Sequence, residues 1–90
     1  MKHQKWIRNY EGNFEKLATE IGDLRYDSLE VFLTLLSKKI NQDSVKDADR
    51  KRIKLASSLE LCSQNLENGA QHIKEAWRIS KPFMNPKGLE

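Results

Sequence analysis

The stretch from residue 44 to residue 80 constrains the fold most, because it contains no proline and Pro82 follows two residues after its end. Its apolar residues recur at helical spacing. One position of a seven-residue repeat holds large residues, namely Val45, Leu59, Leu66 and Ile73. A second position holds mostly small ones, namely Ala48, Leu55, Cys62, Gly69 and Ala76. Small residues let a neighbouring helix approach closely. We therefore predict one long helix over residues 44–80.

The beginning of the chain predicts a first helix over residues 2–21. Trp6, Tyr10, Phe14, Leu17 and Ile21 fall on one helical stripe, and the stripe keeps its phase across a glycine at position 12. The glycine at position 22 is placed to end this helix. An alternative begins the helix after residue 13, which would serve as the N-cap, and leaves residues 1–12 as a mobile arm.

A second helix is indicated from Asp27 to about Asn41. Asp27 and Glu30 have the spacing of a capping box, and an apolar face continues to Ile40. About three residues then remain before Ser44, which with Asp47 repeats the capping-box pattern. So short a connection makes the flanking helices antiparallel. The predicted fold class is all-α, with three antiparallel helices in a short bundle or an extended hairpin and a long C-terminal helix.

The predicted lengths do not match. At about 1.5 Å per residue, the third helix spans about 50 Å and the second only about 20 Å. The second would therefore cover the third only as far as about Ser58, and the first helix would either continue in line or fold onto the second. Both arrangements leave apolar area uncovered, which predicts a homodimer. The expected interface residues are Val31, Leu35, Leu66, Ile73 and Trp77.

Basic residues on both sides of the predicted turn suggest a possible polyanion site. They are Lys38, Lys39, Lys46, Arg50, Lys51, Arg52 and Lys54. Clustered positive charge of this kind binds phosphates, so nucleic-acid binding is the alternative function. The simpler interpretation is a solvated face, because aspartates are interleaved with the cations. Arg52 falls on the predicted apolar stripe, where it could snorkel, pair with a buried carboxylate or mark the end of the core.

No residue pattern indicates catalysis. His72 has Glu75 and Glu67 nearby, but in the reverse of the usual helical metal-ligand order and without a second copy. Cys62 has no adjacent cation or histidine that would activate a thiol. We predict no enzyme, no metal and no cofactor.

Ninety residues make at most one domain, predicted over residues 1–81. Residues 82–90 are expected to form a disordered tail, and Leu89 and Glu90 resemble an expression-vector remnant. A single cysteine and the lack of a long apolar run predict a cytoplasmic protein without a transmembrane segment. The function expected from these features is a small intracellular adaptor or regulator that binds proteins through apolar helix faces and self-associates.

Overall fold

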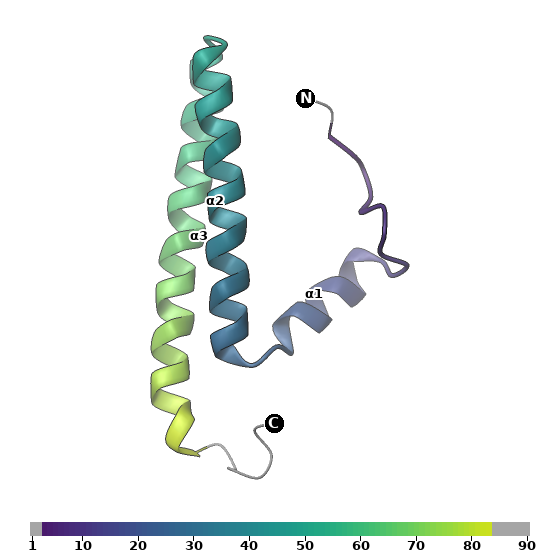
Figure 1. The fold of residues 1–90 in the computed structure, drawn as a ribbon, viewed down its shortest axis with the longest axis vertical. Coiled ribbons are helices and arrows are strands. Elements are labelled where there is room, and N and C mark those ends of the chain that lie inside the picture. The colour runs from purple at the N-terminus through teal and green to yellow at the C-terminus, as the bar shows by residue number, and fades with distance from the viewer. Residues whose placement is uncertain (1–2, 84–90) are drawn as a thin grey trace.

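The computed structural model describes residues 3–83, and every regular element among them is helical. Helix α1 covers Phe14–Gly22, α2 covers Tyr26–Asp49 and α3 covers Ile53–Ser80, followed by the 3₁₀ turn η1, Lys81–Phe83. Helices α2 and α3 lie side by side as a long antiparallel hairpin, while α1 stands at an angle to it (Figure 1). The all-α class and the long last helix are confirmed. A three-helix bundle is not, since within the described residues α1 packs along neither α2 nor α3.

The first helix begins at Phe14, so the prediction of a helix over residues 2–21 is wrong, and the alternative start of the helix after residue 13 is confirmed. Asn13 is the N-cap, and its side-chain oxygen accepts the backbone N–H of Lys16 at 2.8 Å. This bond satisfies a donor that a helix start otherwise leaves unpaired. Before it, the chain folds back so that the Tyr10 ring covers Gly12, where a Cβ atom would lie 2.7 Å from the ring. Gly12 therefore permits a close approach and does not sit inside a helix.

The turn between α2 and α3 lies at residues 50–52, so the predicted connection at residues 41–44 is wrong. Lys51 has a φ of 63°. Its N–H donates to the Ala48 carbonyl at 2.9 Å, and the N–H of Arg52 donates to the Asp47 carbonyl at 2.8 Å. These two bonds form a Schellman motif with a lysine at the left-handed position that glycine usually occupies. The Schellman motif thus ends α2 although the turn contains neither glycine nor proline.

Replacing Lys51 with glycine is expected to stabilise the hairpin by about 0.5–1 kcal/mol, because the Cβ atom of an L-residue disfavours positive φ. Urea unfolding followed by circular dichroism measures this change. The control is Lys54→Gly, which places a glycine in the first turn of α3 and is expected to cost about the same amount. A destabilised Lys51→Gly variant would contradict the left-handed turn.

Small residues form the seam between the two helices, at seven-residue intervals. The seam residues of α2 are Ser37 and Ser44, and those of α3 are Ala56, Ser63 and Ala70; all five are buried. Each of the three serine hydroxyls donates to a carbonyl of the facing helix: Ser37 to Ser63 at 2.8 Å, Ser63 to Ser37 at 2.9 Å, and Ser44 to Ala56 at 2.7 Å. Such bonds require the two backbones to approach closely. Ser44 is therefore a seam residue and not a helix cap.

The predicted mismatch of helix lengths is also wrong. Helix α2 has 24 residues and α3 has 28, so they extend about 36 and 42 Å. Because α2 continues to Asp49, it lies beside α3 over almost the whole length of α3. Only the last turns of α3 project beyond the beginning of α2. There Trp77 is half-buried, and the guanidinium of Arg25 lies 5.5 Å from the centre of its ring.

Candidate interaction surface

Seven large apolar residues of the hairpin lie on one of its two faces. In both helices they occur one residue before or three residues after a seam position, which places them on the same side of the helix; for Leu29 and Leu33 this position is residue 30, seven residues before Ser37. In an antiparallel pair these two sides form a common surface, which we call the apolar face. It consists of Leu29, Leu33, Leu36, Ile40, Leu59, Leu66 and Ile73. All seven are only partly buried. The hairpin therefore has one continuous apolar side, although Val31, Leu35, Val45 and Leu61 are exposed elsewhere on it.

Polar residues occupy the opposite face, which we call the polar face. The residues four positions after the seam are Thr34, Asn41, Glu60, Glu67 and Lys74. Residues three positions after a seam residue and residues four positions after it lie on different sides of the helix. Because the seam itself contains only small side chains, it buries little apolar area. Among residues 3–83, no large side chain is fully buried.

The five predicted interface residues do not form one surface. Leu66 and Ile73 belong to the apolar face, and Trp77 lies at its end. Val31 and Leu35 are 55% and 59% exposed, but they occupy the side of α2 that is turned away from this face. The apolar face also contains five residues that were not among the predicted interface residues, namely Leu29, Leu33, Leu36, Ile40 and Leu59. The seven-residue spacing of Ser37 and Ser44 could have revealed them, had serine been considered a seam residue.

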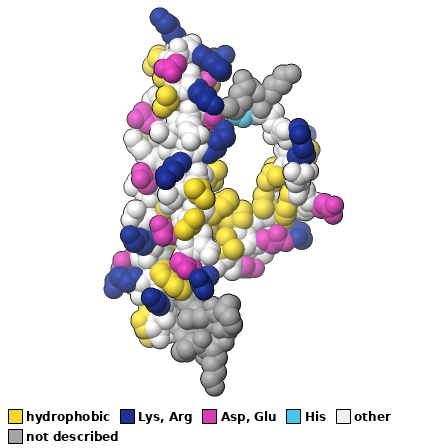
Figure 2. All heavy atoms as spheres, in the orientation of Figure 1, with side chains coloured by type: hydrophobic (Ala, Val, Ile, Leu, Met, Phe, Trp, Pro, Cys, Tyr) yellow, Lys and Arg dark blue, Asp and Glu magenta, His cyan; other side chains and the backbone are white. Residues whose placement is uncertain are grey.

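The segment before α2 stands beside the hairpin and leaves an opening between the two (Figure 2). Within this segment Trp6 contacts Phe14, with ring centres 5.2 Å apart, and both remain more than half exposed. Tyr10 donates a hydrogen bond to Glu20, which also pairs with Lys16. Figure 2 shows hydrophobic side chains on both sides of the opening between the hairpin and this segment. The apolar face is therefore incompletely covered by its own chain.

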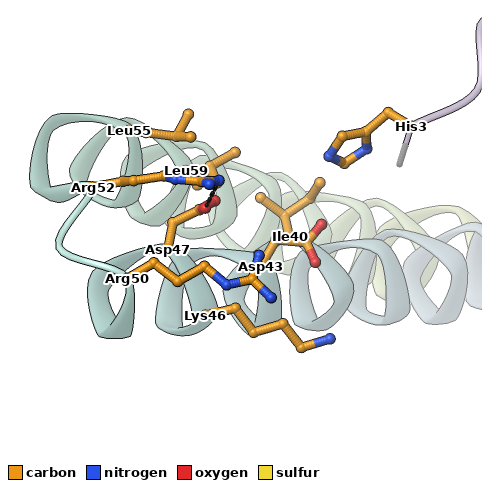
Figure 3. Close-up of a pocket in the computed structure, with 9 residues that line it drawn as sticks. All are labelled: His3, Ile40, Asp43, Lys46, Asp47, Arg50, Arg52, Leu55 and Leu59. Carbon is orange, nitrogen blue, oxygen red and sulfur yellow. Dashed lines mark hydrogen bonds and ion pairs between the residues drawn. The ribbon is translucent and has the colours of Figure 1, made fainter. Parts of the chain in front are cut away.

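A groove of about 260 Å³ lies beside the turn, at the end of the apolar face (Figure 3). Its lining residues are His3, Ile40, Asp43, Lys46, Asp47, Arg50, Arg52, Leu55 and Leu59. Asp43 is buried, and its Oδ2 accepts a 2.6 Å bond from the Lys39 ammonium. This bond lowers the pKa of the Asp43 carboxyl, so the group is charged at neutral pH. Its Oδ1 has no hydrogen-bond partner among the described residues.

The predicted basic cluster is divided by the position of the turn. Lys38 and Lys39 lie in the middle of α2, about 17 Å along the helix from Arg50, and not at the end of the hairpin. Lys46, Arg50, Lys51 and Lys54 lie at or near the turn. Arg52 also lies in the turn, outside any apolar stripe, and donates to Asp47 at 3.3 Å. Of the three roles considered for Arg52, the structure supports the ion pair.

His72 and Cys62 are both exposed on α3. Within residues 3–83 no three or more histidine, cysteine, aspartate or glutamate side chains are grouped so that they could hold a metal ion. In the same part of the chain, no helix is long and apolar enough to cross a membrane.

The hairpin thus presents one extensive surface feature, the apolar face, and one polar groove at its turn. Comparisons with protein-family models, with curated proteins and with solved structures give no match to this chain.

Proposed function

We propose that this chain is a small protein–protein interaction module that self-associates through the apolar face of its α2–α3 hairpin. The observation that supports the proposal is the one-sided row of seven partly exposed large residues beside a seam of small ones. The protein acts as an adaptor or regulator in the cytoplasm and not as an enzyme. Its single cysteine, Cys62, suits a reducing compartment.

The energetic reason to expect self-association is that the side chains of the seam are small. Burial of apolar area supplies most of the free energy that opposes chain entropy. A seam of alanine and serine buries little such area, and a domain of this length is marginal even with a full core. A second layer on the apolar face would bury residues such as Leu33 and Leu66. Contiguous apolar patches on a protein surface commonly mark contact sites.

The experiment is sedimentation analysis of the wild type and of the double variant Leu66→Ala/Ile73→Ala. The wild type is expected to sediment as a dimer at micromolar concentration. The double variant should raise the dissociation constant at least about tenfold, because it removes apolar contact area from both copies. A wild type that stays monomeric up to millimolar concentration would refute self-association.

A matched control is Gln64→Ala/Gln71→Ala. These residues have the same seven-residue spacing on the same helix, but they lie on the polar side. This control should leave the dissociation constant unchanged. Circular dichroism of both variants verifies that the helices are retained, so that a change in mass reports association and not unfolding. An equal loss of mass in both variants would contradict a contact through the apolar face.

Nucleic-acid binding is the alternative, and the geometry favours it less. Two of the seven candidate cations, Lys39 and Arg52, are paired with Asp43 and Asp47. The two aspartates also line the groove in which Lys46 and Arg50 lie, and their negative charges would repel a phosphate there. No such unfavourable charge lies among the seven residues of the apolar face. We therefore favour the interaction module over nucleic-acid binding.

A further inference from the structure

Helix α1 has an apolar side that is incompletely covered. Phe14, Leu17 and Ile21 lie on this side, whereas the ion pair between Lys16 and Glu20 lies on another. Phe14 is 53% exposed, and no residue of α1 is buried. Hydrophobic side chains of the segment before α2 and of the hairpin face each other across the opening (Figure 2). Two apolar surfaces of one chain therefore lie close together without packing on each other.

The spacing of the apolar residues in α1 matches the spacing in the first half of α2. In α1 the intervals are three and then four residues, and in α2 they are four and then three. Read in opposite directions, the two patterns are identical, which is what antiparallel helices require for contact along one side. In that arrangement Phe14 would lie beside Leu36, Leu17 beside Leu33, and Ile21 beside Leu29.

The connection between α1 and α2 is suited to act as a hinge. It consists of residues 23–25, a length that commonly joins antiparallel helices. Arg25 is held to the hairpin, because its guanidinium donates to the Asp27 carboxylate at 2.7 and 2.8 Å and lies 5.5 Å from the centre of the Trp77 ring. Asp23 and Leu24 are both exposed. Rotation of α1 relative to the hairpin is therefore centred on these two residues.

We propose that α1 is a lid for the apolar face, which rotates about Asp23 and Leu24 to pack antiparallel to α2 and thereby opposes self-association. This inference rests on the proposed function, because it assigns regulation to the same face. The closed lid would cover the half of the face next to the beginning of α2, while Ile40 and Leu59 near the turn would stay uncovered. A short tether gives α1 an effective concentration in the millimolar range, so it competes well with a second copy.

Cross-linking within one molecule tests whether the lid closes. Ala18 lies at the edge of the apolar side of α1, on the flank that would face α3 in the closed form. Gly69 lies on the side of α3 that carries the apolar face, and a Cβ atom there meets nothing within 4 Å. The protein Cys62→Ser/Ala18→Cys/Gly69→Cys is diluted until it sediments as a monomer and is then treated with a short bis-maleimide.

The matched control for this protein carries Thr19→Cys in place of Ala18→Cys. This change moves the thiol by one residue, to the opposite side of α1. The protein with a cysteine at position 18 is expected to give severalfold more intramolecular product, identified by mass spectrometry as the 18–69 pair. Equal yields from the two proteins would overturn the lid.

The effect of the lid on association is measured with Leu17→Gln/Ile21→Gln, which removes the apolar contacts of α1 and leaves the hairpin unchanged. Because only open molecules associate, removing the closed form should lower the dissociation constant of the dimer severalfold in sedimentation analysis. Thr19→Gln is the control and should leave this constant unchanged. A constant that does not fall in the double variant overturns the competition, and one that rises would place α1 within the dimer contact.

The two measurements separate the lid from the proposed function. A wild type that dimerises but gives no excess of the 18–69 product overturns the lid and leaves self-association standing. If the wild type and Leu17→Gln/Ile21→Gln both remain monomeric up to millimolar concentration while the 18–69 product is in excess, self-association is refuted. In that case α1 still closes on the apolar face, as a third helix of a monomer.

Discussion

Ser63→Leu is expected to lower the free energy of unfolding of the hairpin by about 3–5 kcal/mol. Ser63 is buried in the seam, where its hydroxyl donates to the Ser37 carbonyl and its carbonyl accepts the Ser37 hydroxyl. A leucine side chain would force the helices apart, which typically costs about 1–3 kcal/mol. Separation would also break both bonds, and each contributes about 1 kcal/mol. Urea unfolding followed by circular dichroism measures the sum.

The matched control for this variant is Ser57→Leu. Ser57 is exposed on the same helix, so the chemical change is identical while the seam is untouched. It is expected to alter stability by at most about 0.5 kcal/mol. Equal effects at positions 57 and 63 would mean that the helices are not in close contact at Ser63.

Ala70→Leu is expected to cost about 1–3 kcal/mol through overpacking alone. Ala70 has 0% of its surface exposed, and it carries no side-chain hydrogen bond that the substitution could remove. Its effect therefore measures the tightness of the seam separately from the serine bonds. The difference between the effects at Ser63 and Ala70 estimates what those bonds contribute.

Ala76→Leu is the control for the second variant. Ala76 lies on the same helix but is only partly buried and outside the seam. A leucine there has room to extend, so the expected change is within about 0.5 kcal/mol. If Ala70→Leu were equally tolerated, the two helices would be farther apart than the structure places them, and the reason for the half-exposed apolar face would be lost.

These seam residues link the sequence to the proposed function. Residues at seven-residue spacing face the partner helix, and here they are serines and alanines. The larger neighbours Leu36, Ile40, Leu59 and Leu66 cannot enter so narrow a seam and remain beside it. One face of the hairpin is consequently apolar and incompletely covered, which is the property that the self-association proposal uses.

Local sequence signals determined part of this fold. The prevalence of helix followed from the apolar periodicity and from the absence of proline before position 82. The end of α3 at Ser80 also followed from Pro82, since a proline ring excludes the helix from continuing.

Only the tertiary structure decided where α2 and α3 separate and which residues line their contact. A serine can cap a helix or donate across a helix pair, and Ser44 does the second because the Ala56 carbonyl lies 2.7 Å away. Lys51 ends α2 in a conformation that its residue type disfavours. Both outcomes require two segments that are distant in the sequence to come into contact. The free energy of that contact exceeds the local preference of Ser44 for a helix cap and of Lys51 for a negative φ.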